Sequence, residues 1–288
     1  MDVRKVPAPV KAMVHLGSRS YGRMTAPARM APSFLICGGQ RCGTTSLYRA
    51  LAAHPVVLKA VLHKGVHYFD TSYRRGMSWY RGHFPLKSSG EKIQQRYGEP
   101  AQTFESSPYY MYHPQAAARI ARDLPGAKLV VLVRDPVERA YSGHSHELAR
   151  GYETEPFDRA VALEAERLAG ERERMVADPG YESHAWQHHA YLRRGQYHEQ
   201  LVALERLVGR ERLHVVDSQD FWTDPEPSFA GVLRFLGLPP HPRTVFERHN
   251  ARSRSPLPAA LRTELEEHFA PHDERLAAWL GRTPSWRR

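Results

Sequence analysis

Short, nearly continuous apolar runs alternate with longer segments of helical periodicity along most of the sequence. The runs at residues 34–37 and 128–133 have the pattern of parallel strands that are buried on both faces. Shorter segments that predict further strands lie at residues 56–58, 102–105 and 213–216. Segments with apolar residues at helical spacing cover residues 44–51, 113–124, 136–150, 195–208 and 225–236. This alternation predicts an α/β fold with a mostly parallel central sheet flanked by helices.

Four other segments carry less regular patterns. Residues 157–176 are rich in Arg and Glu at helical spacing, which predicts a helix with a solvated face. Residues 88–100 are expected to form a charged connection, and a pair of helices is expected after residue 258. Residues 63–85 are dense in aromatic, basic and histidine side chains. That mixture favours the floor of a cleft over an ordinary core.

The chain is predicted to form a single domain, residues 31–288, behind a flexible basic tail, residues 1–30. The tail is rich in proline and alanine and has no continuous apolar core of the kind found in a secretory signal. The 288-residue sequence contains no apolar stretch of about 18 residues, so no transmembrane segment is expected. Its two cysteines, Cys37 and Cys42, flank a glycine-rich loop where a disulfide would distort the backbone. We therefore expect a reducing, cytoplasmic location.

Charge narrows the range of partners. The formal net charge is +10, which favours an anionic partner such as a nucleotide, a nucleic acid, an acidic glycan or an anionic membrane surface. The histidines at 184, 188 and 189 have neither cysteines nor paired carboxylates near them in the sequence. We therefore expect no metal site there.

A glycine-rich turn joins the first predicted strand to the first predicted helix. Backbone N–H groups at such a helix N-terminus, together with the helix dipole, favour a bound anion. The spacing of Gly38 and Gly43 matches the P-loop of nucleoside triphosphatases, but Thr44 occupies the position of the P-loop lysine, and the loop's cation is Arg41. A simple turn would explain the glycines but not Arg41 or the three hydroxyl residues after Gly43. The sequence thus predicts a P-loop-like site for a phosphate-like donor that needs no triphosphate-bound metal.

A second anion site is predicted at the end of the strongest strand. Arg134 follows that strand directly, at the sheet edge where open α/β folds bind ligands. Ser142 lies about two helical turns further on. Two phosphate sites without a P-loop lysine indicate a nucleotide that carries anionic groups at two places.

Together these motifs resemble the sulfotransferases that use 3′-phosphoadenosine 5′-phosphosulfate (PAPS). The resemblance is to the branch with the heparan sulfate N- and 3-O-sulfotransferases and their bacterial relatives, and it runs from about Ser33 to Trp286. The motifs that carry it are GGQRCGTTSL, KGVHYFD, ESSPYY, RDPVERAYS, RGQYHEQL and NARSRSPLP. The resemblance implies transfer of a sulfuryl group from PAPS to a hydroxyl or amine. The acceptor would be a glycan, a glycolipid or another small molecule.

The resemblance also implies roles for individual residues. Those expected to bind the phosphosulfate are Arg41, Cys42, Gly43, Thr44, Thr45 and Ser46. Those expected to bind the 3′-phosphate are Arg134 and Ser142, with Arg252 and Arg254 in a loop that closes over the donor. Those expected to face the acceptor are Lys64, His67, Tyr68 and His146.

Two departures from the family pattern affect these roles. Gly65 stands where the family carries a glutamate that is often assigned as the catalytic base. His67 is the preferred base here, oriented by Asp70, with Glu105 as the next candidate; a purely structural role for His67 is the alternative. Ser106 stands where heparan-modifying members often carry a lysine, which weakens the prediction of a heparan-like acceptor.

Two other functions remain to be weighed. A small-molecule kinase with a degenerate phosphate loop would bind the same kind of anion, but the missing P-loop lysine argues against it. A nucleic-acid-binding protein would explain the basic charge. The arginines are dispersed and often interleaved with glutamates, however, rather than gathered in one stripe. We therefore expect no nucleic-acid partner.

Overall fold

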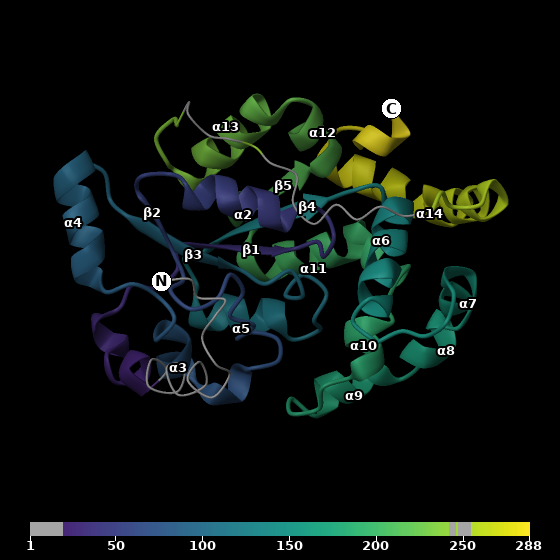
Figure 1. Cartoon of the computed structure of the whole chain (residues 1–288), viewed down its shortest axis with the longest axis horizontal. Coiled ribbons are helices and arrows are strands. Elements are labelled where there is room, and N and C mark those ends of the chain that lie inside the picture. The colour runs from purple at the N-terminus through teal and green to yellow at the C-terminus, as the bar shows by residue number, and fades with distance from the viewer. Residues whose placement is uncertain (1–19, 242–245, 247–254) are drawn as a thin grey trace.

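The strands form one parallel sheet in the computed structural model, which describes residues 20–241, 246 and 255–288 (Figure 1). Within these residues the five strands run in the order β2-β3-β1-β4-β5, and every neighbouring pair is parallel. Their bounds are β1 Phe34–Gly38, β2 Val57–Lys59, β3 Gln102–Ser106, β4 Lys128–Val133 and β5 Leu213–Asp217. The predicted fold class is confirmed.

The sheet order creates a crevice between β1 and β4. The chain leaves β1 toward β2 on one side of the sheet, and it leaves β4 toward β5 on the other side. Neighbouring strands whose connections diverge in this way mark the place where open α/β sheets bind ligands. All residues of β1 are buried, and in β4 all but Lys128 are. Burial of these two central strands explains their nearly continuous apolar sequences.

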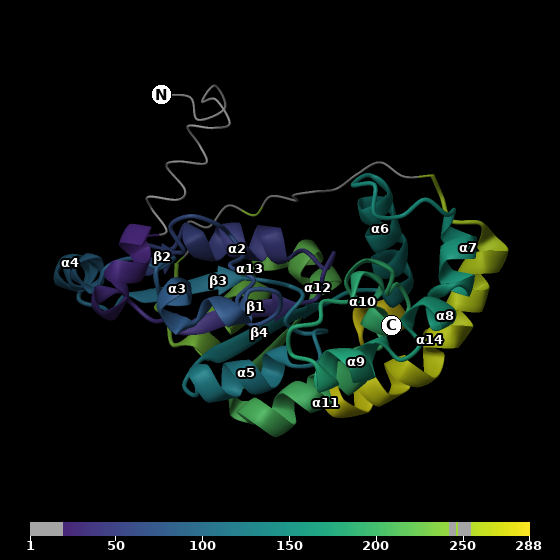
Figure 2. The same ribbon diagram turned by 90° about the horizontal axis from the view of Figure 1, so that it is seen from below.

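Helices cover both faces of the sheet. Figures 1 and 2 show α2 (Thr44–Ala52) and α13 (Pro225–Leu236) on one face, with α5 (Ala116–Asp123) and α11 (Tyr197–Val208) on the other. The short helix α12 (Ser218–Thr223) follows β5 directly. The remaining short helices are η2 Ala26–Ala28, η3 Tyr73–Arg75, α3 Met77–Arg81, η4 Arg193–Gly195, η5 Arg210–Arg212 and η6 Ser285–Arg287.

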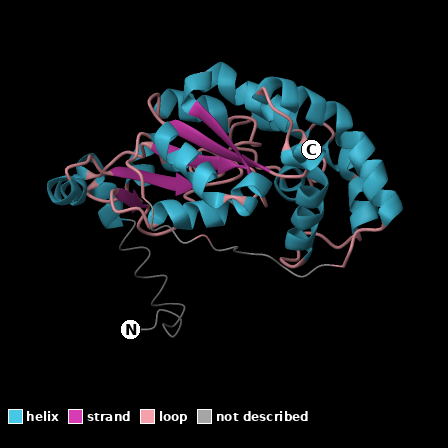
Figure 3. Ribbon diagram, turned by 90° about the horizontal axis from the view of Figure 1, so that it is seen from above, coloured by secondary structure: helices cyan, strands magenta, loops and turns pink. Residues whose placement is uncertain are grey.

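A helical lobe extends beyond one side of the sheet, as Figure 3 shows. It comprises α6 Pro136–Leu148, α7 Phe157–Ala162, α8 Glu164–Leu168, α9 Glu171–Ala177, α10 His184–His188 and α14 Ala259–Leu280. Residues from α6, α7 and α14, among them Val137, Phe157 and Phe269, form an apolar cluster inside this lobe. None of the helices in the described part of the chain is long and apolar enough to cross a membrane.

Three predictions about the helices were wrong in detail. The segment 157–176 forms three short helices. The chain turns through Gly170, in the left-handed region (φ 72°), between the second helix and the third. The charged segment 88–100 is largely the helix α4 (Lys87–Tyr97), whose mostly polar sequence hides any apolar periodicity. The expected C-terminal helix pair is one long helix, α14, which continues through Pro271, followed by a short 3₁₀ turn.

Residues 20–30, which were assigned to the tail, pack against the domain. Ala26 is buried, and the Arg29 guanidinium donates a hydrogen bond to the carbonyl of Phe84 (2.5 Å). The backbone N–H of Met30 donates to the carbonyl of Pro85 (2.9 Å). The expected boundary at residue 30 therefore falls inside the folded chain.

The aromatic segment 63–85 mainly contributes to the core. Tyr68, Phe69, Tyr80 and Phe84 are buried, and the rings of Tyr68 and Tyr80 stack with centroids 4.7 Å apart. Aromatic side chains gain most from burying their large apolar area, and this outweighs the polarity of the residues between them. The segment lies mostly beneath the site, and its first residues alone reach the cavity described below.

Candidate active site

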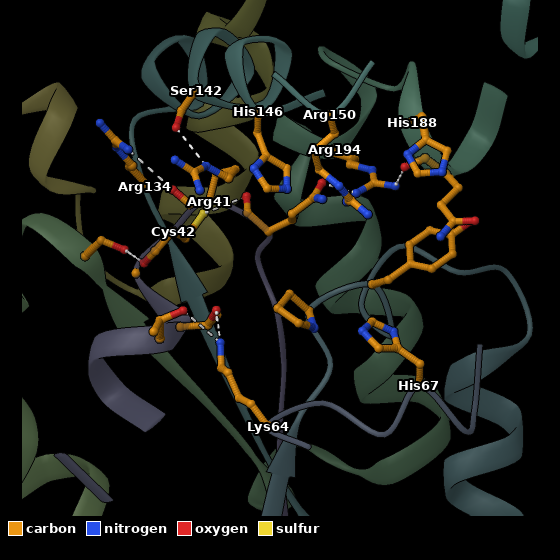
Figure 4. Close-up of a pocket in the computed structure, with 18 of the residues that line it drawn as sticks. Arg41, Cys42, Lys64, His67, Arg134, Ser142, His146, Arg150, His188 and Arg194 are labelled. Carbon is orange, nitrogen blue, oxygen red and sulfur yellow. Dashed lines mark hydrogen bonds between the residues drawn. The ribbon is translucent and has the colours of Figure 1, made fainter. Parts of the chain in front are cut away.

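A cavity of about 680 Å³ lies at the carboxyl ends of the central strands (Figure 4). Its wall brings together the β1–α2 loop, the loop after β2, the end of β4, and parts of α6, α10 and α12. The lining residues are Gln40, Arg41, Cys42, Gly43, Thr44, Thr45, Lys64, His67, Thr71, Pro108, Tyr109, Arg134, Ser142, His146, Arg150, Gln187, His188, Arg194, Ser218, Gln219 and Trp222. Most of the predicted donor loop and three of the four predicted acceptor residues thus share one cavity.

The β1–α2 loop is held to the neighbouring strand. The N–H of Gly39 donates to the carbonyl of Leu132 in β4 (2.7 Å). Gly43 is the N-cap residue of α2 and adopts a left-handed backbone (φ 91°), which glycine tolerates best. Arg41 also has a positive φ of 69°, which is uncommon for a residue with a Cβ. Residues in such sparsely populated conformations tend to cluster at functional sites.

The two predicted anion sites are in contact with each other. Arg41 Nε donates to Ser142 Oγ (3.0 Å), and Arg134 Nη1 donates to the backbone carbonyl of Arg41 (3.4 Å). Arg134 also forms an ion pair with Glu138, one helical turn into α6 (3.5 Å). Three predicted donor-binding side chains thus lie side by side, although more than 90 residues separate Arg41 from Arg134.

Lys64 reaches the same loop from the opposite wall. Its Nζ donates to Thr45 Oγ1 (3.0 Å) and Thr44 Oγ1 (3.3 Å), the hydroxyls of the first two residues of α2. Burial and the positive charge of Arg49 lower the pKa of Lys64 to about 8. Lys64 was predicted to face the acceptor, and the structure places its amine against the donor loop as well.

His67 and Asp70 form the expected pair. His67 Nδ1 lies 2.8 Å from Asp70 Oδ2, and the Asp70 side chain is completely buried. Burial of the imidazole opposes its protonation, but the hydrogen bond and charge of Asp70 outweigh it, so the pKa of His67 is raised above its ordinary value. With Nδ1 bound to Asp70, the tautomer protonated at Nδ1 leaves Nε2 as a proton acceptor.

The close approach of the backbone at Gly65 explains why this position has no side chain. A Cβ there would lie 2.6 Å from the carbonyl oxygen of Ser106 and 3.3 Å from His67 Nε2. Real Cβ atoms essentially never come as close as 2.6 Å to a backbone oxygen, so a glutamate cannot occupy this position without a backbone shift. His67 Nε2 lies beside the space that such a side chain would enter.

Glu105 lies beneath the cavity and does not line it. Its carboxylate accepts hydrogen bonds from the N–H of Val66 (2.9 Å) and from the hydroxyls of Ser107, Tyr110 and Tyr80 (2.6, 2.6 and 3.3 Å). Burial raises the pKa of Glu105, although these hydrogen bonds oppose the shift. With four donors directed at a fully buried carboxylate, Glu105 is placed to support the Lys64–His67 loop rather than to meet a substrate.

Only some of the other predicted site residues line the cavity. Cys42 and His146 line the cavity, whereas Tyr68 and Ser46 are buried elsewhere and do not. Tyr68 is part of the aromatic core, which corrects its assignment to the acceptor site. Ser106 is also buried and faces no substrate space. Arg252 and Arg254 lie outside the described residues.

Several lining residues were not predicted. Trp222 of α12 lies over the donor loop, with ring atoms 3.6 Å from where a Cβ of Gly43 would be. Arg150 and Arg194 line the other part of the cavity together with His188, whose Nδ1 lies 2.8 Å from a Glu147 carboxylate oxygen. Arg194 belongs to the RGQY segment, the one signal in the sequence that could have found it.

The fold and the site define a class of protein. A parallel sheet in this order, with a glycine-rich loop after its central strand and a cationic side chain at the end of the neighbouring strand, has the arrangement of α/β domains that bind mononucleotides. The family model of the sulfotransferase domain matches residues 31–256, and the chain belongs to that family.

Relatives and solved structures agree with this membership. Human heparan sulfate glucosamine 3-O-sulfotransferase 5 is 26% identical over 294 residues, which cover 93% of this chain and 78% of the relative. Human bifunctional heparan sulfate N-deacetylase/N-sulfotransferase 3 is 26% identical over 298 residues, which cover 89% of this chain but 31% of the relative. This chain thus spans about a third of that relative's length. The crystal structure of a sulfotransferase from Alicyclobacillus acidocaldarius is similar to this chain, with a TM-score of 0.65 and 28% identity. It covers 90% of this chain and 100% of its own.

Proposed function

We propose that this protein transfers a sulfuryl group from PAPS to a hydroxyl or amine of a glycan acceptor. The observation that carries the proposal is the joining of two anion sites, through the Arg41–Ser142 contact, in a cavity that also holds the His67–Asp70 pair. A donor with a phosphosulfate and a separate phosphate fits such an arrangement. Membership of the sulfotransferase family supports it and removes the grounds for a kinase or a nucleic-acid-binding protein.

The cavity wall suits a donor with several negative charges. Of the described residues that line it, none is acidic, and its cations include Arg41, Lys64 and Arg134. We infer that Arg41, Lys64 and the N-terminus of α2 hold the phosphosulfate, and that Arg134 and Ser142 hold the 3′-phosphate. The indole of Trp222 offers a face on which the adenine can stack.

The proposed reaction is an in-line displacement at sulfur. The acceptor oxygen or nitrogen forms a bond to sulfur as the bond from sulfur to the 5′-phosphate oxygen breaks, and that oxygen keeps the electron pair. His67 Nε2 takes the proton of the acceptor, and buried Asp70 stabilises the resulting imidazolium. Arg41 and Lys64 stabilise the charge that develops on the departing phosphate. The products are the sulfated acceptor and adenosine 3′,5′-bisphosphate.

A glycan is the proposed acceptor because the relatives described above are named as heparan sulfate sulfotransferases. Lipid-linked alcohols and small phenols are the competing acceptors. The test mixes the protein and PAPS with unsulfated glycosaminoglycan oligosaccharides, glycolipids and phenols, and follows the formation of adenosine 3′,5′-bisphosphate. Release that requires a glycan supports the proposal, whereas release with phenols or glycolipids alone would reassign the acceptor.

Arg41→Ala is the matched test of the donor site. We expect kcat to fall by about 10²-fold or more, the effect of losing one key donor to transition-state charge. Near-wild-type turnover in this variant, or magnesium-dependent turnover of ATP by the wild type in place of PAPS turnover, would contradict the proposed function.

A further inference from the structure

The segment that follows α14 packs against the helix that carries Trp222. Figure 1 shows this segment, residues 282–288, in yellow beside α12. The chain turns back toward α12 after Gly281, the C-cap residue of α14, which has a φ of 69°. The segment itself does not line the cavity, whereas Ser218, Gln219 and Trp222 of α12 do. Contacts between the two elements therefore connect the donor site to a part of the chain that lies outside it.

Asp217 is the residue at which the two elements meet. It is the N-cap of α12, and its buried carboxylate accepts from the backbone N–H groups of Gln219 (2.9 Å) and Asp220 (3.4 Å). Ser285 adds two donors, because its N–H donates to Asp217 Oδ2 (2.9 Å) and its hydroxyl donates to Oδ1 (2.7 Å). A buried carboxylate is costly unless its oxygens are hydrogen-bonded. The four donors therefore hold Asp217 in one position.

Two exposed ion pairs join the same elements. Arg282 and Arg288 both bind Asp220, Arg282 at 3.2 Å. All three side chains are at least 36% exposed, and ion pairs between exposed side chains contribute little to stability. A hydrogen bond to a buried charged group contributes more. Ser285 is thus the residue of the segment on which the position of α12 depends most.

The helix α12 needs such support because it is short. It has six residues, and a helix of that length is not stable without tertiary contacts. Phe221 is completely buried in the core and anchors one face of α12. The hydroxyl of Ser218 donates to the carbonyl of Cys42 in the β1–α2 loop (2.5 Å). The start of α12 is therefore joined to the donor loop through Ser218 and to the 282–288 segment through Asp217.

We propose that Ser285 is a positioning residue of the donor site. Through Asp217 it holds α12 against the β1–α2 loop, so that the indole of Trp222 meets the nucleotide. This inference rests on the proposed function and goes beyond it, because it assigns a role in donor binding to a residue outside the cavity. Ser285 contacts neither donor nor acceptor, so its loss should weaken donor binding and leave kcat unchanged.

The test compares three single variants of the full chain. Ser285→Ala removes the hydroxyl donor, and Ser285→Thr retains a hydroxyl. The matched control is Arg287→Gln in the same segment, because Arg287 binds Asp273 of α14 (2.7 Å). Calorimetry gives the Kd for adenosine 3′,5′-bisphosphate, initial rates give kcat and the KM for PAPS, and hydrogen–deuterium exchange of residues 218–223 reports on α12 in the free protein.

Ser285→Ala should raise the Kd for the nucleotide and the KM for PAPS about threefold, less than loss of the stacking contact itself. Amide exchange in α12 should become about tenfold faster, the low end for a lost hydrogen bond to a charged group. Ser285→Thr should restore both values, and Arg287→Gln should change neither. In a Trp222→Ala background, Ser285→Ala should weaken nucleotide binding no further, because both changes act through the same indole.

Unchanged nucleotide affinity or unchanged exchange of α12 in Ser285→Ala would overturn the proposal. Equal effects in Arg287→Gln would do the same, since they would show a general loosening of the segment. An additional loss of affinity in the Trp222→Ala background would also overturn it. If the wild type failed to bind the nucleotide, that result would count against the proposed function, and exchange of α12 in the free protein would decide the Ser285 contact separately.

Discussion

Lys64 offers the sharpest test of the donor site because its charge changes within an accessible pH range. The amine is bound to the hydroxyls of Thr44 and Thr45, and its pKa is lowered to about 8. An anion held by those hydroxyls is attracted by the ammonium and not by the neutral amine. We therefore expect kcat/KM for PAPS, which reports on groups of the free enzyme, to fall above about pH 8.

The size of the effect follows from the titration. With a pKa of about 8, roughly a tenth of Lys64 remains protonated at pH 9, so kcat/KM should fall about tenfold between pH 7 and pH 9. Lys64→Arg keeps its charge throughout this range, because a guanidinium does not lose its proton in proteins. Lys64→Gln has no charge at any pH and loses a charge-assisted hydrogen bond of about 1.5–3 kcal/mol, a factor of roughly 10 to 150.

The assay measures initial rates of adenosine 3′,5′-bisphosphate formation from pH 6.5 to 9.5 at constant ionic strength, with circular dichroism to confirm folding at each pH. The wild type should lose activity on the alkaline side, Lys64→Arg should not, and Lys64→Gln should be low and flat there. An unchanged alkaline limb in Lys64→Arg would assign the titration to another group and refute the reasoning.

Three further predictions test other parts of the structure. His67→Ala should lower kcat by about 10²-fold or more with donor affinity kept, and an unchanged kcat in this variant would remove His67 as the base. Asp70→Asn should lower kcat less than His67→Ala does. It should also shift the acid limb of the kcat profile to lower pH, because Asp70 raises the pKa of His67. Trp222→Ala should weaken binding of adenosine 3′,5′-bisphosphate by about fivefold or more in calorimetry, the low end for a lost stacking contact, and unchanged affinity would place the adenine elsewhere. Glu153 is bound by Arg167 (2.7 Å). Burial opposes ionisation of Glu153, but the hydrogen bonds that its carboxylate accepts outweigh burial and lower the pKa of Glu153 to about 2. The stability that ionised Glu153 contributes is present above about pH 4.5 and is lost as pH falls toward 2. Glu153→Gln should therefore lower the free energy of unfolding by about 3 kcal/mol at pH 7, measured by urea denaturation, and should make that free energy depend less on pH in the acid range. An equally steep pH dependence of the unfolding free energy in the variant would contradict this.

Features that are marked by a local pattern of residues, such as the strands and the donor loop, could be predicted from the sequence. The five strands lie within about a residue of their predicted positions. The central strands β1 and β4 were the clearest, because parallel strands buried on both faces need nearly continuous apolar runs. The donor loop was equally predictable from the sequence, since its glycines, Arg41 and its hydroxyl residues lie together in one short segment. Trp222 was not, because no motif marks it and its position depends on how α12 packs over the loop.

The acceptor side was harder to predict for the same reason. Aromatic side chains suit a cleft floor and a core equally well in a sequence, and burial of Tyr68 was decided by its packing on Tyr80. Arg150 and Arg194 are 44 residues apart in numbering and become neighbours of one cavity only through the helical lobe. Charge content alone could not tell them from the many arginines that form surface ion pairs.

The loop that carries Lys64 and His67 shows how the site can work without a glutamate at position 65. Buried Glu105 accepts from the N–H of Val66, and Ser107, which donates to Glu105, accepts from the N–H of His67 (3.0 Å). These bonds draw the loop so close to β3 that no side chain fits at Gly65. The same approach brings His67 Nε2 beside the vacated space, with Nδ1 fixed by Asp70. A carboxylate beneath the loop therefore positions an imidazole where the family pattern places a carboxylate, and the proposed proton acceptor and its support come from different residues.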